Sequence, residues 1–111
     1  MERSGKSADW FDKEYFSLNG TKSGFSYPYT WEIEGAERLL RVQEFRGLFN
    51  PTRVLDVGCA LGFMVKALTL SGIEAEGFDC SKWAVENSEV RDKLKIHDVR
   101  EPFPYPAYSF D

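Results

Sequence analysis

The chain has 111 residues and a formal net charge of −4, and 42% of its residues are hydrophobic, 15% aromatic and 29% charged. This composition excludes a disordered tail and predicts a small acidic globular domain with a substantial core. No run approaches the ~18 apolar residues of a membrane span, no apolar stretch typical of a secretory signal follows Met1, and no block of Lys or Arg offers a surface for nucleic acid. We therefore expect a cytoplasmic protein that binds neither membranes nor nucleic acid.

Residues 1–29 form an aromatic-rich arm. Its rings, among them Trp10, Phe16 and Tyr29, stand among Gly, Ser, Asn and Lys. Regular spacing is limited to residues 9–18, where one short helix fits. We expect these rings to pack on the domain, and a lid over a ligand is the alternative.

The domain itself is expected over residues 30–111, and it opens with a helix. Thr30 can act as its N-cap, Asn50-Pro51 ends it, and Glu34 can pair with Arg38 one turn later. The stripe expected to face the core consists of Ile33, Ala36, Leu39, Leu40, Gln43 and Gly47.

After this helix, strand and helix patterns alternate. Strands are expected at 53–57, 73–78 and 94–99, and helices at 63–70 and 81–88. Gly72 is placed to end the first of these helices, and the Pro-rich segment 102–108 is expected to be an extended loop. Short connections between parallel strands need crossover helices, so the order predicts an α/β fold with a parallel sheet.

Each expected strand delivers an aspartate to its carboxyl end, where ligands bind in open parallel sheets. These residues are Asp56, Asp79 and Asp98, and a loop from Gly58 to Gly62 follows the first. Asp79 stands near the ~20-residue offset at which an acid accepts hydrogen bonds from a ribose. The pattern therefore predicts a nucleoside-containing ligand.

The positions of the glycines narrow the choice of ligand. A dinucleotide fingerprint starting at Gly58 needs further glycines where Ala60 and Phe63 stand. A phosphate-binding loop needs a lysine after Gly62, and a magnesium-dependent phosphatase needs carboxylates clustered beside Asp56. None of these patterns is present, so phosphate and magnesium chemistry are disfavoured.

Cys59, Cys80 and His97 are expected near strand ends, but none shows the paired spacing of metal ligands. We therefore expect free thiols and no metal site.

The run from Val54 to Gly62, VLDVGCALG, resembles the first signature of class I S-adenosylmethionine-dependent methyltransferases. Residues 77–81 resemble the second signature, and residues 95–111 resemble the segment that leads into the fourth strand of that family. One departure is Ala60, where the pattern prefers glycine. The resemblance implies a Rossmann-like sheet, truncated before its fourth strand, and S-adenosylmethionine as cofactor.

The resemblance also assigns roles to individual residues. It implies that the backbone around Asp56, Gly58 and Gly62 lines the methionine part of the cofactor, that Asp79 accepts both ribose hydroxyls, and that Asp98 accepts the adenine amino group. The full set of implied cofactor-binding residues is Asp56, Gly58, Cys59, Ala60, Gly62, Asp79, Cys80, Asp98 and Val99. Alternatively, Asp56 only braces the loop and Asp98 is solvated.

The resemblance implies methyl transfer to an unknown acceptor. Substrate-positioning residues in that family come largely from beyond the fourth strand, so no catalytic residue is assigned and residues 1–111 alone are expected to be inactive. A nucleoside-binding module without catalysis is the alternative function.

The first strand is apolar on both sides, which is typical of a central strand, yet no fourth strand is expected beside it. We therefore expect a homodimer through residues 53–58, or the Pro-rich tail folded over them.

Overall fold

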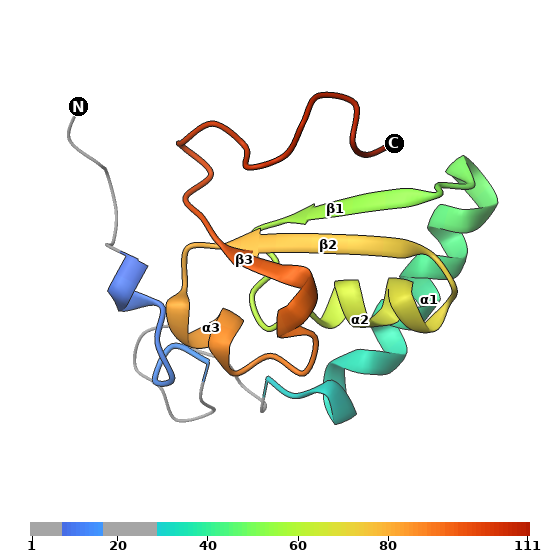
Figure 1. Ribbon diagram of the computed structural model, residues 1–111. Helices are drawn as coiled ribbons and strands as arrows, with labels where there is room; N and C mark the ends of the chain where they lie inside the picture. The colour runs from blue at the N-terminus through green and yellow to red at the C-terminus, as the bar shows by residue number, and fades with distance from the viewer. Residues whose placement is uncertain (1–7, 17–28) are drawn as a thin grey trace.

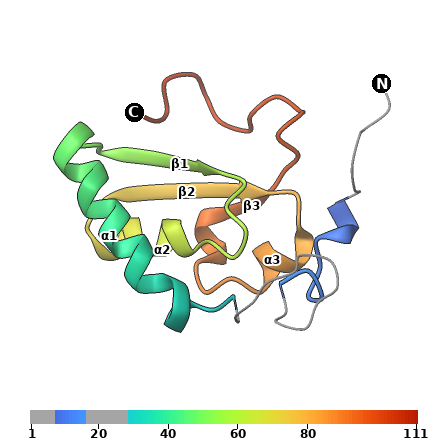
Figure 2. The ribbon, with the colours of Figure 1, turned by 180° about the vertical axis from the view of Figure 1, so that it is seen from behind.

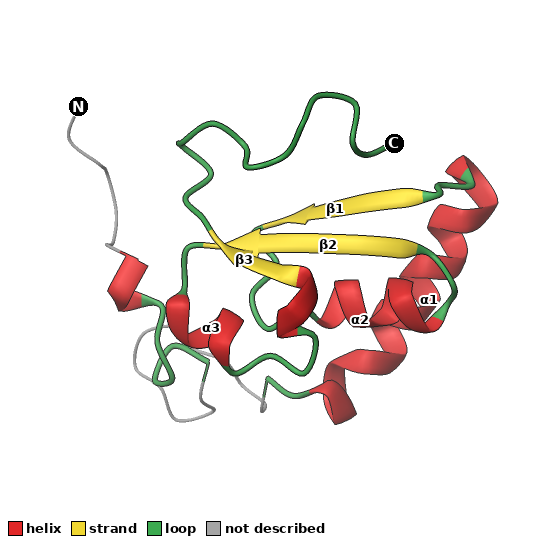
Figure 3. Ribbon diagram, in the orientation of Figure 1, coloured by secondary structure: helices red, strands yellow, loops and turns green. Residues whose placement is uncertain are grey.

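The computed structural model describes residues 8–16 and 29–111 of the chain (Figures 1 and 3). In chain order, its elements are η1 (Ala8–Trp10), α1 (Trp31–Phe49), β1 (Arg53–Val57), α2 (Phe63–Leu70), β2 (Glu74–Asp79), α3 (Lys82–Glu86), η2 (Arg91–Lys93) and β3 (Leu94–Ile96).

The three strands form one parallel sheet in the order β1-β2-β3. In its register Leu55 lies opposite Glu76, and Phe78 lies opposite Lys95. All three α-helices cover the same face of the sheet, and the C-terminal segment crosses the other face (Figures 1 and 2). The prediction of an α/β fold with a parallel sheet and flanking helices is confirmed.

The helix after Thr30 begins and ends where the sequence indicates, but it buries a different face. Its buried residues are Glu34, Gly35 and Val42. The expected stripe is wrong at all its positions except half-buried Leu39, because Ile33, Ala36, Leu40, Gln43 and Gly47 are exposed. The physical reason is that α1 packs chiefly on α2, which selects one of several apolar faces.

Two elements are shorter than expected. The helix predicted over 81–88 ends at Glu86, because the hydroxyl of buried Ser88 instead donates to Leu61 O at 2.7 Å. The strand predicted over 94–99 ends at Ile96, because the chain turns where Glu101 N donates to Asp98 O.

The Pro-rich segment forms no helix or strand, as expected, and it covers the face of the sheet that carries no helices. The Phe103 ring lies 5.2 Å from the Phe78 ring, and the Lys95 ammonium lies over Tyr105. The rings of Phe103 and Tyr105 thus account for the burial of Phe78.

The core lies between the sheet and α2, and it includes Val65, Leu68, Ala75 and Leu94. Within the described parts of the chain, no helix combines the length and the apolar character that crossing a membrane requires.

Candidate functional site

The loop after β1 folds back over the end of β2. The Phe78 carbonyl accepts from Gly58 N at 2.9 Å and from Cys59 N at 3.0 Å. This crossing depends on Gly77, where an added Cβ would lie 2.8 Å from Cys59 Cβ and 3.0 Å from Asp56 O. This role of Gly77 was not predicted from the sequence, although a glycine inside a strand is a signal for close backbone approach.

Two glycines of the loop have left-handed backbone conformations, but their surroundings differ. Gly58 has φ 75° and open space where a side chain would stand. Gly62 has φ 78°, and an added Cβ would lie 2.9 Å from Val90 and 3.0 Å from Leu94. Gly58 therefore leaves room for a ligand, whereas Gly62 permits close packing against Val90 and against Leu94 at the start of β3.

Ala60 also has left-handed backbone, with φ 51°. An alanine in this region is strained relative to glycine. The Ala60 N–H donates to Asp79 Oδ2 at 2.8 Å, so the strained turn is joined directly to the end of β2.

Asp79 is the residue that organises the site. Its Oδ1 accepts from Ser81 N at 2.8 Å, while its Oδ2 accepts from Ala60 N. Each carboxylate oxygen has two lone pairs, so one acceptor position on each oxygen is still available. The two backbone donors fix the orientation of the carboxylate, and the two remaining positions match a pair of neighbouring hydroxyl groups.

Asp56 lies at the end of β1 in a more buried environment. Burial raises the pKa of Asp56 to about 6; the charge of Arg38 opposes this rise and the charge of Asp79 adds to it. Among the described residues, no hydrogen bond to the Asp56 carboxylate is present. The group is therefore desolvated without a compensating contact, which favours a cationic ligand beside it.

The carboxylate of Asp98, the third predicted site residue, accepts hydrogen bonds from Arg100. Its Oδ1 accepts from Arg100 Nε at 2.9 Å and from Arg100 N at 2.9 Å, and its Oδ2 accepts from Arg100 Nη2 at 2.6 Å. An adenine amino group would have to share Oδ2 with Arg100. Val99 beside it is exposed, and Cys80 is half-buried.

Aromatic rings surround the start of α2 and of α3. Tyr29 lies 4.9 Å from Phe63, and Phe16 lies 5.6 Å from Tyr29 and stacks on Trp83 at 5.6 Å. The Ser81 hydroxyl donates to Phe11 O and accepts from Ala84 N. The described part of the arm thus packs on the domain beside the loop.

Both cysteines lie in surroundings that disfavour the thiolate form. Both are free, and burial raises the pKa of Cys59 to about 12 and raises the pKa of Cys80. Within residues 8–16 and 29–111, no three His, Cys, Asp or Glu side chains gather as metal ligands.

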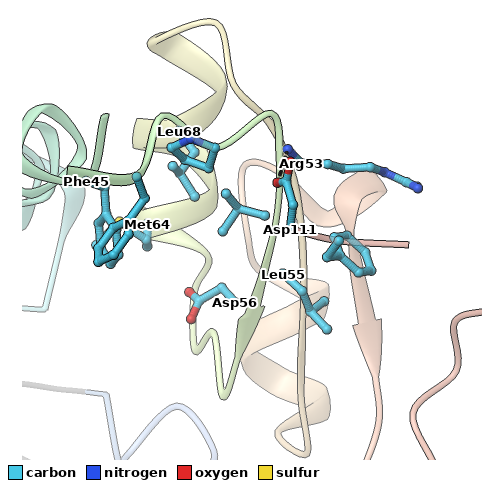
Figure 4. A pocket seen from close by; sticks show the side chains of 11 residues that line it. Phe45, Arg53, Leu55, Asp56, Met64, Leu68 and Asp111 are labelled. Atoms are coloured by element: carbon cyan, nitrogen blue, oxygen red, sulfur yellow. Dashed lines mark hydrogen bonds between the residues drawn. The ribbon is translucent and has the colours of Figure 1, made fainter. Parts of the chain in front are cut away.

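An apolar pocket of about 440 Å³ lies between α1, α2 and the free edge of β1. Figure 4 shows Phe45, Met64 and Leu68 grouped on one side of it, with the Asp56 carboxylate at the end away from Arg53. The pocket therefore reaches the candidate site only through Asp56.

No protein-family model and no curated protein matches this chain. The function is therefore argued from the geometry of the site.

Proposed function

We propose that this chain binds S-adenosylmethionine as the cofactor-binding part of a class I methyltransferase with a Rossmann-like sheet. The observation that carries the proposal is Asp79, held by Ala60 N and Ser81 N with one acceptor position left on each oxygen. A ribose offers two adjacent hydroxyl donors, which match these positions.

The charges around the loop support a cation in preference to a phosphate. Asp56 and Asp79 both lie at the carboxyl edge of the sheet, and the residues that open α2 are Phe63 and Met64. A sulfonium centre gains from nearby carboxylates, whereas a diphosphate would be repelled by them.

The open space beside Gly58 supports the same reading, because a ligand that lies along the loop needs close approach to the backbone. Cys59 and Ala60, which directly follow Gly58, have small side chains. In such a site, the residues described here bind and orient the cofactor, and the cofactor supplies an activated methyl group for in-line displacement.

The strand order supports the Rossmann-like assignment. Among the described strands β1 pairs with β2 alone, and its other edge is bonded to Asp111 only at Arg53, which leaves the rest of that edge open to a further strand. A sheet extended on that side would place β1 centrally, with the candidate site above the middle of the sheet.

The proposal is tested by calorimetric titration of the chain with S-adenosylmethionine and with S-adenosylhomocysteine, with NAD and ATP as controls. We expect the chain to bind S-adenosylmethionine and S-adenosylhomocysteine but not NAD or ATP. Binding of NAD or ATP in preference would contradict the proposal. An assay of methyl transfer tests the separate expectation that residues 1–111 alone are inactive, and turnover above background would contradict that expectation.

A further inference from the structure

Residues 8–16 of the arm reach the candidate site through Ser81, the residue that precedes α3. Ser81 is fully buried, and its N–H donates to Asp79 Oδ1 at 2.8 Å. Its hydroxyl accepts from Ala84 N at 3.0 Å and donates to Phe11 O in the arm. One residue therefore links the arm, the start of α3 and the carboxylate that is proposed to bind a ribose.

A second contact joins the arm to α3. The Phe16 ring is buried and stacks on the Trp83 ring, with the centroids 5.6 Å and the planes 18° apart. Figures 1 and 2 both show residues 8–16 beside α3. Val85, on the same helix, belongs to the buried core. The helix is thus held between the core and the arm.

α3 is too short to hold Ser81 in place by itself. It has five residues, whereas an isolated helix needs at least ~12 to be stable in water. The position of the Ser81 N–H therefore depends on what packs against α3. Asp79 receives its other backbone donor from Ala60, at Oδ2, so without the Ser81 donor only one of its two oxygens would be fixed.

We propose that residues 8–16 of the arm are part of the ribose site, and that Ser81 is the positioning residue through which the docked arm fixes the Asp79 carboxylate. This inference rests on the function proposed above. In this role the arm acts through Ser81, whereas a lid would cover the ligand directly. Because the coupling between two binding events is reciprocal, ligand binding in turn stabilises the docked arm.

Two ligands that differ by one hydroxyl group measure how well Asp79 is positioned. S-adenosylhomocysteine has both ribose hydroxyls, and its 2′-deoxy analogue lacks one. The ratio of their dissociation constants, measured by titration calorimetry, is the preference for the ribose. We expect the wild type to prefer S-adenosylhomocysteine by about 10- to 100-fold, the range for a hydrogen bond to a charged group. A variant that only lowers the folded fraction weakens the binding of both ligands equally and leaves the preference unchanged.

Phe16→Ala weakens the docking of the arm and leaves every residue of the candidate site in place. We expect it to lower the preference by about 5-fold, a typical coupling between two sites. Ser81→Ala should lower the preference at least as much, and the double variant should show no further decrease, because the arm acts through Ser81.

Two further variants complete the experiment. Phe16→Leu keeps an apolar group at the buried position and replaces Phe16→Ala if that variant does not fold. Phe49→Ala is the matched control, because it removes an exposed ring from the last residue of α1, and it should keep the preference of the wild type.

An unchanged preference in a folded Phe16 or Ser81 variant would overturn the inference, because the arm would then have no influence on Asp79 through Ser81. A decrease in the double variant that equals the sum of the two single effects would also overturn it, since the arm would then act by a separate route. In both cases the preference of the wild type leaves the proposed function standing. A wild type that bound neither ligand would remove the proposed function and this inference together.

Discussion

Asp79 gains its importance from two backbone donors that come from different elements. Ala60 N belongs to the loop after β1, and Ser81 N belongs to the start of α3. The carboxylate therefore stabilises the loop as well as offering acceptors to a ligand. A substitution here has consequences for both binding and stability, and the two must be measured separately.

We predict that Asp79→Ala weakens S-adenosylhomocysteine binding by about 1.5 to 3 kcal/mol, the range for hydrogen bonds to a charged group. Titration calorimetry measures the affinity, and denaturant unfolding of the same variant measures the accompanying loss of stability. Asp92→Ala, at an exposed aspartate in η2 outside the candidate site, serves as the control. Unchanged affinity in a folded Asp79→Ala chain would rule out the ribose assignment.

Asp56 makes stability depend on pH. Its folded pKa of about 6 lies above the ordinary value of 3.8, so the ionised group destabilises the fold above pH 6. As the pH falls from 6 toward 3.8, the folded state takes up the proton first and this penalty is lost. We predict that Asp56→Asn is more stable than the wild type at pH 8, by at most about 3 kcal/mol, and that the difference disappears near pH 4.

Denaturant unfolding at a series of pH values measures this difference, and Asp92→Asn, at an exposed carboxyl group, is the control. A wild type that is equal to or more stable than Asp56→Asn at pH 8 would show that Asp56 has a partner not seen here.

At the scale of the elements, the loop from Gly58 to Gly62 connects β1 to α2 through two left-handed glycines that face different surroundings. A side chain added at either Gly58 or Gly62 would be strained, because both residues have a positive φ. Only Gly62 adds a clash, with Val90 before η2 and with Leu94 at the start of β3.

We therefore predict that Gly62→Ala destabilises the chain by about 2 to 4 kcal/mol, since strain and overpacking add, and that Gly58→Ala costs about 1 kcal/mol. Thermal or denaturant unfolding of the two variants compares them directly. Equal losses would mean that the packing around Gly62 relaxes without cost. Ligand affinity should show the opposite order, because Gly58 faces the open space.

At the scale of the whole molecule, the free edge of β1 is only partly covered. Asp111 N donates to Arg53 O, and the Asp111 carboxylate accepts from Arg53 N and from Thr52. Both backbone groups of Arg53 thus point away from β2. In a strand, the backbone N–H and C=O groups of alternate residues point to the same side. Those of Leu55 and Val57 therefore point to the same free edge as those of Arg53.

This edge is a template for a second chain, so we predict concentration-dependent self-association between micromolar and millimolar concentration. Val57→Lys, which places a charge beside the edge, should shift the equilibrium toward monomer. Val99→Lys is the control, because Val99 is also exposed but lies beyond β3. Sedimentation equilibrium that finds monomer throughout for the wild type would show that the tail protects the edge on its own.

The sequence by itself determined the parts of the molecule that depend on local signals. Alternating apolar residues, β-branched residues and glycines locate β1, α2 and β2 to within a residue or two, because each signal lies inside the element that it specifies. The same local pattern places Asp56 and Asp79 at strand ends, and parallel strands bring those ends to one edge.

Only the tertiary structure decided contacts between segments that are distant in the chain. The buried face of α1 depends on where α2 lies, and the neighbours of Gly62 come from beyond α3. The effect of the Arg38 charge on the pKa of Asp56 has the same origin, because the two residues lie on different elements that the fold brings together. Sequence periodicity indicates which faces of a helix could be buried. The packing of the layers selects one of these faces, because the choice depends on how all the other side chains fit together.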